Sequence, residues 1–450
     1  MTRIGHSERS YPRMLVIPPG PKAREIIRMD AQLLSQATRH LYPLVVDSAK
    51  GCIIKDVDGN EFIDFSSASG VANTGHNHPK IVDAIRVQLD KALGFGYGVG
   101  YREDVVRVTD VLARITPGEK EKSVCYCTSG SEAVEAGIKA AAWHTRGHVF
   151  FSFTGAFHGR TLGSLSLSSA NSVHKRYFPS STRVVKFAYP YCFRCPLGQQ
   201  HPGCNCCCID AIEDCLKRDV PPEEVACIVV EPVQGEGCIV PPSDYFEKLS
   251  RVARKHGLLL LDDEVLTGIG RTGRWFAIEN WKVSPDLISV GGSLSSGLPI
   301  GAVIGSLDVM DWEPDTHSST LGGNPLACVS AIATIETIRE EHLLENAVKE
   351  GNYMLSRLRE TAEKHPILGD VRGKGLLIGV EIVKDSRLRE PDHEAARQIM
   401  LRSWRRGVLI ETVGESTLRL CPPLVVDRGM VDVTLDILES TIHETASEVC

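Results

Sequence analysis

The chain has 450 residues, of which 42% are hydrophobic and 24% charged; this composition is typical of folded globular proteins and excludes a disordered or fibrous chain. Its length allows two or three domains and excludes a minimal binding module. Because 50 Lys and Arg stand against 57 Asp and Glu, the net charge of -7 offers no basic surface for nucleic acid, and a small-molecule partner is favoured.

The start of the chain and its apolar runs predict a cytoplasmic protein. The opening segment MTRIGHSERSYPRMLVIPPGPK is interrupted by charge and proline before the apolar region of a signal peptide could form. The longest aliphatic run, at 258–261, is far shorter than the ~18 residues that a membrane-spanning helix needs.

The N-terminal part predicts short strands joined by a turn at Asp58-Gly59, and then a helix that begins near Pro79. Short apolar runs then alternate with helical patterns, which indicates an α/β fold with a mainly parallel sheet. The predicted strands are 124–127, 149–153, 227–230, 258–261 and 287–290, and the clearest helices are 131–144 and 245–256.

Toward the C-terminus, a long helical pattern over 340–364 precedes strand patterns over 369–383 and 417–426. We expect both chain ends to build one smaller α+β domain. Residues 1–79 form its N-terminal part, residues 80–345 form a large domain, and residues 346–450 complete the small domain.

Polar residues follow several predicted strands, at the sheet edge where open parallel sheets bind ligands. Gly130 and Ser131 join a strand to a helix, so their backbone N–H groups predict an anion site or an ordinary helix cap. Asp263 ends an apolar strand and needs a cationic partner, unless Asp262 and Asp263 only cap the next turn.

Residues 268–273 match the dinucleotide-binding pattern G-x-G-x-x-G. However, residues 262–267 separate this segment from its strand, and no helix start follows it. The pattern therefore favours a loop that needs close backbone approach.

Seven segments in collinear order make the chain resemble the class III aminotransferases, which are pyridoxal-phosphate (PLP) enzymes of fold type I. The resemblance spans roughly residues 40–430. The segments are GHNHP (75–79), TSGSEAVEAGIKAA (128–141), FHGRTLGSLSL (157–167), EPVQGEG (231–237), DEVLTGIGRTGRWFA (263–277), SSGLPIGAVIG (295–305) and STLGGNPLAC (319–328).

The resemblance implies a cofactor site. Gly130 and Ser131 would hold the phosphate, Phe157 and Val265 would lie on the two faces of the ring, and Asp263 would pair with the ring nitrogen. A buried carboxylate keeps that nitrogen protonated, so the ring can stabilise a carbanion at the substrate α-carbon. The remaining residues that the resemblance places at the cofactor are His158, Glu231 and Thr320.

The resemblance also implies a partner subunit and substrates. Thr320 would reach the phosphate of a neighbouring subunit, in a homodimer or a dimer of dimers. Arg419 would bind the carboxylate of an amino acid or a 2-oxo acid, with Glu236 as its gating partner. The alternative for Arg419 is a solvated surface charge.

The chain departs from the family at two positions. The family's Schiff-base lysine is expected where this chain has Gly292, and no lysine occurs from Val283 through Val348. That lysine holds the cofactor and moves the α-proton, so its loss predicts non-covalent PLP and turnover reduced by ~10²- to 10⁴-fold or more. Leu266 stands where the family usually has a glutamine that contacts the ring oxygen.

Three functions stay open at this point. The resemblance implies an aminotransferase that is severely impaired, and the alternatives are an amino-acid racemase and a non-catalytic PLP-binding protein. If a different base replaces the lysine, His158 is the nearest candidate by motif.

Six cysteines fall between Cys192 and Cys208, and they begin with a C-x-x-C pair. A zinc site, reduced thiols packed in a loop and a disulfide all stay open. A similar insert in archaeal-type ornithine aminotransferases and broad-specificity racemases implies a mostly structural segment, so we assign no metal ligand here. For His76 and His78, a turn before the helix at Pro79 is favoured over metal ligation.

Overall fold

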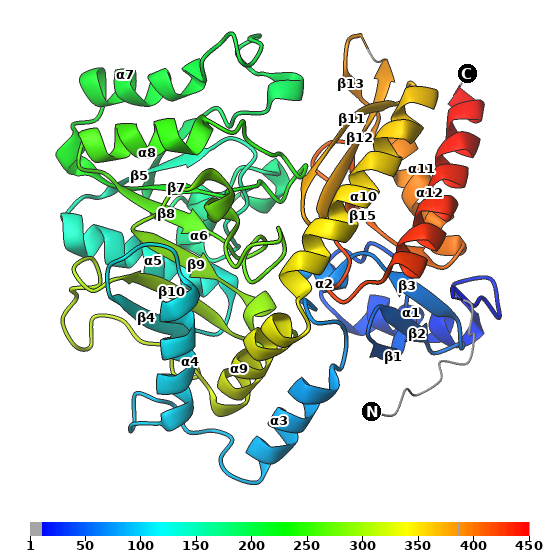
Figure 1. Cartoon of the computed structure of the whole chain (residues 1–450), viewed down its shortest axis with the longest axis horizontal. Helices are drawn as coiled ribbons and strands as arrows, with labels where there is room; N and C mark the ends of the chain where they lie inside the picture. The colour runs from blue at the N-terminus through cyan, green and yellow to red at the C-terminus, as the bar shows by residue number, and fades with distance from the viewer. Residues whose placement is uncertain (1–10, 386, 450) are drawn as a thin grey trace.

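The computed structural model describes residues 11–385 and 387–449 (Figure 1). Its largest sheet has seven strands in the order β4-β10-β9-β8-β7-β5-β6. Strand β10 is antiparallel to both of its neighbours, and the other pairings are parallel. The strands are β4 (Lys122–Cys127), β5 (Val149–Phe153), β6 (Arg183–Phe187), β7 (Val225–Val230), β8 (Leu259–Asp263), β9 (Leu287–Val290) and β10 (Gly301–Ser306).

Both faces of this sheet are covered, which confirms the predicted α/β class. Alternate strand residues point to opposite faces, so Tyr126 and Phe151 join one hydrophobic cluster, whereas Cys125 and Phe150 join another. Helix α5 (Gly130–Thr145) packs on one face and α8 (Tyr245–Lys255) covers part of the other, as their buried residues show. All five predicted strands and both clear helices are present.

The two ends of the chain lie together beside the large sheet, as the blue and the orange-to-red elements of Figure 1 show. A four-stranded sheet joins N-terminal strands to β14, which pairs with β3. A second sheet is built from C-terminal strands alone, and the domain boundaries stay a prediction. The strands are β1 (Val46–Lys50), β2 (Ile53–Asp56), β3 (Glu61–Asp64), β11 (Leu368–Lys374), β12 (Leu377–Asp385), β13 (Glu390–Pro391), β14 (Val408–Leu409), β15 (Glu411–Val413) and β16 (Thr417–Leu420).

The remaining helices connect and cover these sheets. None that the structure describes is long and apolar enough to cross a membrane. The predicted helix start at Pro79 is confirmed by α3. The helices are α1 (Pro21–Leu33), α2 (Ser67–Gly70), α3 (Pro79–Leu89), α4 (Glu103–Ile115), α6 (Leu162–Leu167), α7 (Asp210–Arg218), α9 (Pro325–Glu340), α10 (Leu343–Lys364), α11 (His393–Arg405) and α12 (Arg428–Val449).

Three C-terminal predictions are corrected in detail. The helical pattern over 340–364 is interrupted, because His342 adopts a left-handed conformation with φ of 54° between α9 and α10. The strand pattern over 369–383 is a hairpin that turns at Gly375. The pattern over 417–426 ends at Leu420, since Pro422 and Pro423 have no N–H groups for a sheet.

The G-x-G-x-x-G segment is a loop, as predicted, and the next helical element is a short 3₁₀ helix at Ala277–Trp281. Gly270 and Gly273 have φ of 98° and 80°, and a Cβ atom on Gly273 would lie 2.3 Å from a Val348 methyl group. Close backbone approach thus explains both glycines.

Candidate active site

Three turns meet at one edge of the seven-stranded sheet. Because β10 is antiparallel, its first residues pair with the carboxyl ends of both neighbours, Gly301 with Cys127 and Ala302 with Val290. The turns after β4 and β9 therefore lie next to each other, and β8 ends beside them. A Cβ atom on Gly130 would lie 2.5 Å from a Val265 methyl group, and one on Gly291 would lie 2.8 Å from the same methyl.

The first of these turns opens α5. Ser129 caps the helix by accepting a hydrogen bond from the Glu132 N–H at 3.2 Å. Gly130 and Ser131 are the first two residues of the helix, and N–H groups there have no intrahelical acceptor. The Ser131 hydroxyl accepts from the Arg160 N–H at 3.3 Å, which ties the 157–160 loop to this helix start.

Asp263 ends β8 as a buried carboxylate, 4% exposed. It accepts a hydrogen bond from His158 Nδ1 at 2.6 Å and one from the Val265 N–H at 3.1 Å. The His158 side chain is fully buried behind it, and no partner for its Nε2 occurs among the described residues. Two carboxylate oxygens accept more than two hydrogen bonds, so Asp263 keeps capacity for a further donor.

Glu231 follows β7 and holds the backbone on either side of the site. It accepts hydrogen bonds from the N–H groups of Phe157 at 3.0 Å and Gly235 at 2.9 Å. Burial raises the pKa of Glu231 to about 7, although His158 and the two N–H donors act against this rise. Glu231 therefore fixes Phe157 in place through its backbone.

The resemblance predicts two apolar side chains, Phe157 and Val265, as the walls of the site. Phe157 is half-buried, and the Arg160 guanidinium lies 5.0 Å from its ring centroid on one side. Val265 is half-buried between Gly130 and Gly291. Leu266 fills space next to the site, because Cβ atoms on Gly70 and Gly235 would lie 2.6 and 2.7 Å from its methyl groups.

Gly292 begins the short helical turn after β9. Its backbone lies outside the left-handed region, and a Cβ atom there would meet only Val71, at 3.4 Å. The position accepts a side chain without strain, so the fold itself does not require glycine at residue 292.

The structure adds one lysine that no motif indicated. Lys186 on β6 donates hydrogen bonds to the carbonyl oxygens of Leu167, at 3.0 Å, and Ser168. Ser168 in turn accepts from the His158 N–H at 2.9 Å. Burial and the neighbouring Lys175 lower the pKa of Lys186 to about 7.

Arg419 is buried rather than a solvated surface charge. Its Nε and Nη2 atoms donate to the same Glu411 oxygen at 2.9 and 2.6 Å, and the other Glu411 oxygen accepts from the Ser69 hydroxyl. Glu236 instead accepts from the Gly414 N–H at 2.8 Å. The structure thus pairs Arg419 with Glu411 and not with the expected Glu236.

Three other residues of the sequence analysis, Thr320, His76 and His78, form no described hydrogen bond or ion pair with Asp263. Thr320 is exposed and borders, with Thr128 and Glu132, a surface hollow of about 410 Å³. His76 and His78 bond to different carboxylates, Asp64 at 2.7 Å and Glu341 at 3.3 Å.

The donors at this edge suit a flat anionic ligand with a basic ring. A helix N-terminus can bind a phosphate group, and Phe157 and Val265 offer apolar surface. Among the described residues, no Lys or Arg forms an ion pair with Asp263. This buried carboxylate is thus suited to a protonated ring nitrogen, and the set fits PLP.

The sequence of residues 34–442 matches the family described as aminotransferase class-III. The chain belongs to this family. The fold agrees with solved aminotransferase structures, and the family is PLP-dependent.

Several curated relatives cover nearly the whole chain. It is 39% identical to the alanine/serine racemase of Pyrococcus horikoshii, over 97% of this chain and 93% of that protein. It is 37% identical to the leucine/methionine racemase of Thermococcus litoralis, over 94% and 96%. The 4-aminobutyrate aminotransferase GabT of Escherichia coli is 34% identical, over 94% and 98%.

A solved amine transaminase from an uncultivated Pseudomonas species, in its PLP-bound form, has a similar fold. Its TM-score is 0.84 at 29% identity, and the match covers 92% of this chain and 97% of that one. The class III relatives of this chain thus include both racemases and aminotransferases.

Proposed function

We propose that this chain binds PLP without a covalent bond, and that it is a racemase-type class III protein whose turnover is severely impaired. The carrying observation is the buried Asp263 carboxylate combined with the absence of any lysine from Val283 through Val348. The racemases at 39% and 37% identity support the reaction type.

The residues of the candidate active site have separate roles in this proposal. Gly130 and Ser131 bind the phosphate through their N–H groups. Asp263 holds a proton on the ring nitrogen, and His158 orients the Asp263 carboxylate through the 2.6 Å hydrogen bond. PLP, when bound, supplies an electron-accepting ring that stabilises negative charge at the α-carbon of an amino acid.

Gly292 takes the position of the family's lysine in this proposal and offers no amine. No group at this position would then hold the cofactor or move the α-proton. His158 does not replace it, because its side chain is buried and bonded to Asp263. Loss of the acid and base group alone reduces turnover by ~10²- to 10⁴-fold.

The Arg419 side chain is already paired with Glu411, which bears on substrate binding. An aminotransferase must accept an amino acid and a 2-oxo acid in turn, whereas a racemase handles one ligand. Glu411 already neutralises the Arg419 that would bind a carboxylate in the resemblance. Amino acids and 2-oxo acids both carry a carboxylate, so both gain less from Arg419 while Glu411 is paired with it.

We further propose a cytoplasmic homodimer in which Thr320 completes the partner's phosphate site. Gly96 lies against the Thr320 carbonyl, since a Cβ atom there would be 2.6 Å from that oxygen. The segment around Gly96 exposes apolar side chains, which favours an interface; they are Leu89, Leu93, Phe95, Val99 and Tyr101. All described cysteines are free thiols, in keeping with a reducing compartment.

The test compares the native protein with Gly292→Lys and with Gly292→Met, which matches the length of lysine without its amine. We expect native protein to bind PLP on titration and lose it on dialysis. Only Gly292→Lys should retain PLP on residue 292 after borohydride reduction, as mass spectrometry of peptides would show.

The Gly292→Lys variant also distinguishes racemisation from amino-group transfer. With PLP and L-alanine but no 2-oxo acid, Gly292→Lys should form D-alanine, as chiral chromatography would show. A borohydride-stable adduct on a lysine of the native protein, Lys186 included, would contradict the missing-amine assignment. Amino transfer to a 2-oxo acid without racemisation would overturn the racemase proposal.

A further inference from the structure

The cysteine-rich segment after β6 contains two C-x-x-C pairs. Cys192-Phe193-Arg194-Cys195 is the first, and Cys204-Asn205-Cys206-Cys207 is the second. Residues 196–203 separate them. Pairs with this internal spacing are typical of structural zinc sites, which take four ligands in a tetrahedral arrangement.

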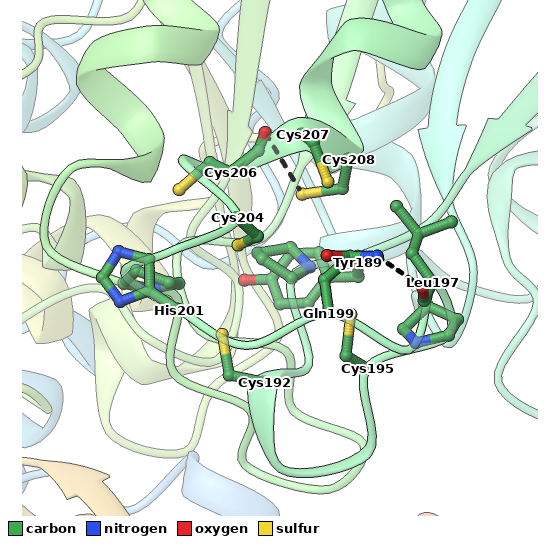
Figure 2. Close-up of a pocket in the computed structure, with 13 residues that line it drawn as sticks. Tyr189, Cys192, Cys195, Leu197, Gln199, His201, Cys204, Cys206, Cys207 and Cys208 are labelled. Carbon is green, nitrogen blue, oxygen red and sulfur yellow. Dashed lines mark hydrogen bonds between the residues drawn. The ribbon is translucent and has the colours of Figure 1, made fainter.

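The fold brings the two pairs to opposite sides of one cavity. Figure 2 shows the thiols of Cys192 and Cys195 on one side of it, and those of Cys204, Cys207 and Cys208 on the other. The cavity has a volume of about 20 Å³, which is room for one occupant the size of a water molecule. A single metal ion fits this space.

Tight turns hold each pair in shape. Cys192–Arg194 forms a 3₁₀ helix, and the Gly198 N–H donates to the Cys195 carbonyl at 3.0 Å. The Cys207 N–H donates to the Cys204 carbonyl at 3.0 Å. These turns position both members of each pair at the cavity before any metal binds.

A second donor set lies nearby but is already satisfied. The ligand atoms of His201, Cys206 and Asp244 all lie within 4.8 Å of one another. However, Asp244 accepts from Lys248 Nζ at 2.6 Å and contacts His201 Nε2 at 2.9 Å. This ion pair neutralises the carboxylate that a metal would need.

We propose that Cys192, Cys195, Cys204 and Cys207 bind one zinc ion as a structural site. No three of these thiols have their sulfur atoms within 4.8 Å of one another in the described structure, so binding must draw them inward into the cavity. Tetrahedral coordination by four thiolates favours zinc over magnesium or calcium.

The site would fix a segment that contacts both halves of the molecule. The Tyr189 hydroxyl donates to the Glu231 carbonyl at 2.8 Å, beside the candidate active site. On the other side, the Tyr191 hydroxyl and Arg194 Nη1 each contact Glu381 on β12 at 2.7 Å. Metal binding should therefore stabilise the junction between the large sheet and the C-terminal sheet.

The experiment uses untagged full-length protein, purified under reducing conditions without chelator. Elemental analysis should find about one zinc per chain, and cobalt substitution should give the thiolate charge-transfer and visible bands of a tetrahedral site. Cys192→Ser and Cys204→Ser, one from each pair, should each weaken zinc binding by more than the ~10- to 100-fold that loss of an outer partner costs.

Cys215→Ser is the matched control, because Cys215 is a buried thiol on α7 outside the cavity. It should bind zinc as the native protein does. Chelation should lower the thermal midpoint of the native protein and of Cys215→Ser, but leave that of Cys192→Ser unchanged.

Four results would overturn the proposal. These are no zinc uptake by the reduced protein, iron with sulfide in place of zinc, a disulfide among these cysteines in the reduced preparation, and zinc that survives Cys192→Ser but is lost in His201→Ala. None of them bears on PLP binding, which is measured separately.

Discussion

Two buried charged clusters of this protein differ in how far they are neutralised. The carboxylate cluster, made of Glu231, Asp262, Asp263 and Glu264, lies at the ends of β7 and β8. The arginine cluster, made of Arg372, Glu381, Glu411 and Arg419, lies on the C-terminal sheet. Both are almost fully removed from water.

In the arginine cluster each cation has a carboxylate of its own. Arg372 pairs with Glu381 and Arg419 with Glu411, both at 2.6 Å. In the carboxylate cluster, the one ion-pair partner found among described residues is His158, on Asp263. Burial and the neighbouring Glu264 raise the pKa of Asp262 well above its usual range, so part of this cluster is kept neutral by protons.

This difference separates a site that is complete from a site that needs a ligand. Buried charges persist when they are paired, protonated or bound to a ligand. The arginine cluster satisfies the first condition within the chain. Asp263 is paired only in part, through His158, which is why we place the cationic ring nitrogen of PLP there.

The largest expected effect comes from removing the Asp263 carboxylate, the buried charge that the chain pairs only in part. Removing one partner of a buried pair costs ~3–5 kcal/mol, so Asp263→Ala should weaken PLP binding by on the order of 10²- to 10³-fold. Asp262→Asn is the matched control on the same strand, and it should leave the affinity unchanged because Asp262 is already protonated. Equal PLP affinity in Asp263→Ala and native protein, by absorbance titration, would remove the role of Asp263.

The next effect tests whether the arginine cluster is structural. Burial acts to raise the pKa of Glu381, but Arg372 and the Tyr191 and Thr417 hydroxyls outweigh it and lower the pKa to about 2. This ion pair therefore contributes stability above the ordinary carboxyl pKa, and the contribution is lost as the pH falls toward 2.

Glu381→Gln should accordingly lower the free energy of unfolding at neutral pH by about 3 kcal/mol, measured by urea denaturation. The difference between variant and native protein should shrink on acidification. A difference that stays constant from pH 7 to strongly acidic conditions would contradict the ion-pair account.

A smaller effect, on the binding of a 2-oxo acid, is expected from Glu411, which pairs with Arg419. Glu411→Gln removes the charge that neutralises Arg419, so an aliphatic 2-oxo acid should bind the PLP-loaded protein about 10-fold more tightly. Ser69→Ala is the control, because it removes a hydrogen bond to Glu411 but keeps the ion pair. Unchanged affinity in Glu411→Gln, by calorimetry, would mean that Arg419 does not face the ligand.

A last effect is a dependence of stability on pH that arises from Glu231. Its folded-state pKa of about 7 lies above the ordinary value of 4.5, so the folded state holds this proton more tightly. The resulting stability is fully present below the ordinary pKa and is lost as the pH rises through about 7, at up to ~1.4 kcal/mol per pH unit.

Glu231→Gln should remove this contribution. Urea midpoints between pH 5 and pH 8 should therefore fall less steeply in the variant than in native protein. Parallel slopes in the two proteins would show that Glu231 does not titrate in this range.

Five of the seven strands of the large sheet could be predicted from the sequence, because most of them are buried on both faces, whereas β6 and β10 were not predicted. Such strands are continuous apolar runs, as at β7 and β8, and the polar residues directly after them mark the ligand edge. This pattern marks Asp263 as a candidate, whereas its role at the cofactor is implied by the resemblance and stays a prediction. Gly130 and Ser131 were found because a strand passes directly into a helix there.

Tertiary pairing was harder to predict. Glu411 and Arg419 lie directly opposite each other on β15 and β16, so a hairpin centred near Gly414 carried a signal for their pairing that motif comparison missed. His342 and Lys186 carried no signal. The first breaks a helix by adopting a left-handed backbone without being glycine, and the second is buried only by the fold around it.

The antiparallel course of β10 has a consequence for how this protein could change over time. The turns after β4 and β9 are closed by main-chain pairing to β10, and residue 292 contributes no side chain to that closure. If residue 292 is the position of the reactive group, as we propose, exchanging that group leaves the architecture intact. Catalytic activity and stability of the fold therefore do not depend on the same residue here, and a descendant can lose its activity while it keeps its structure.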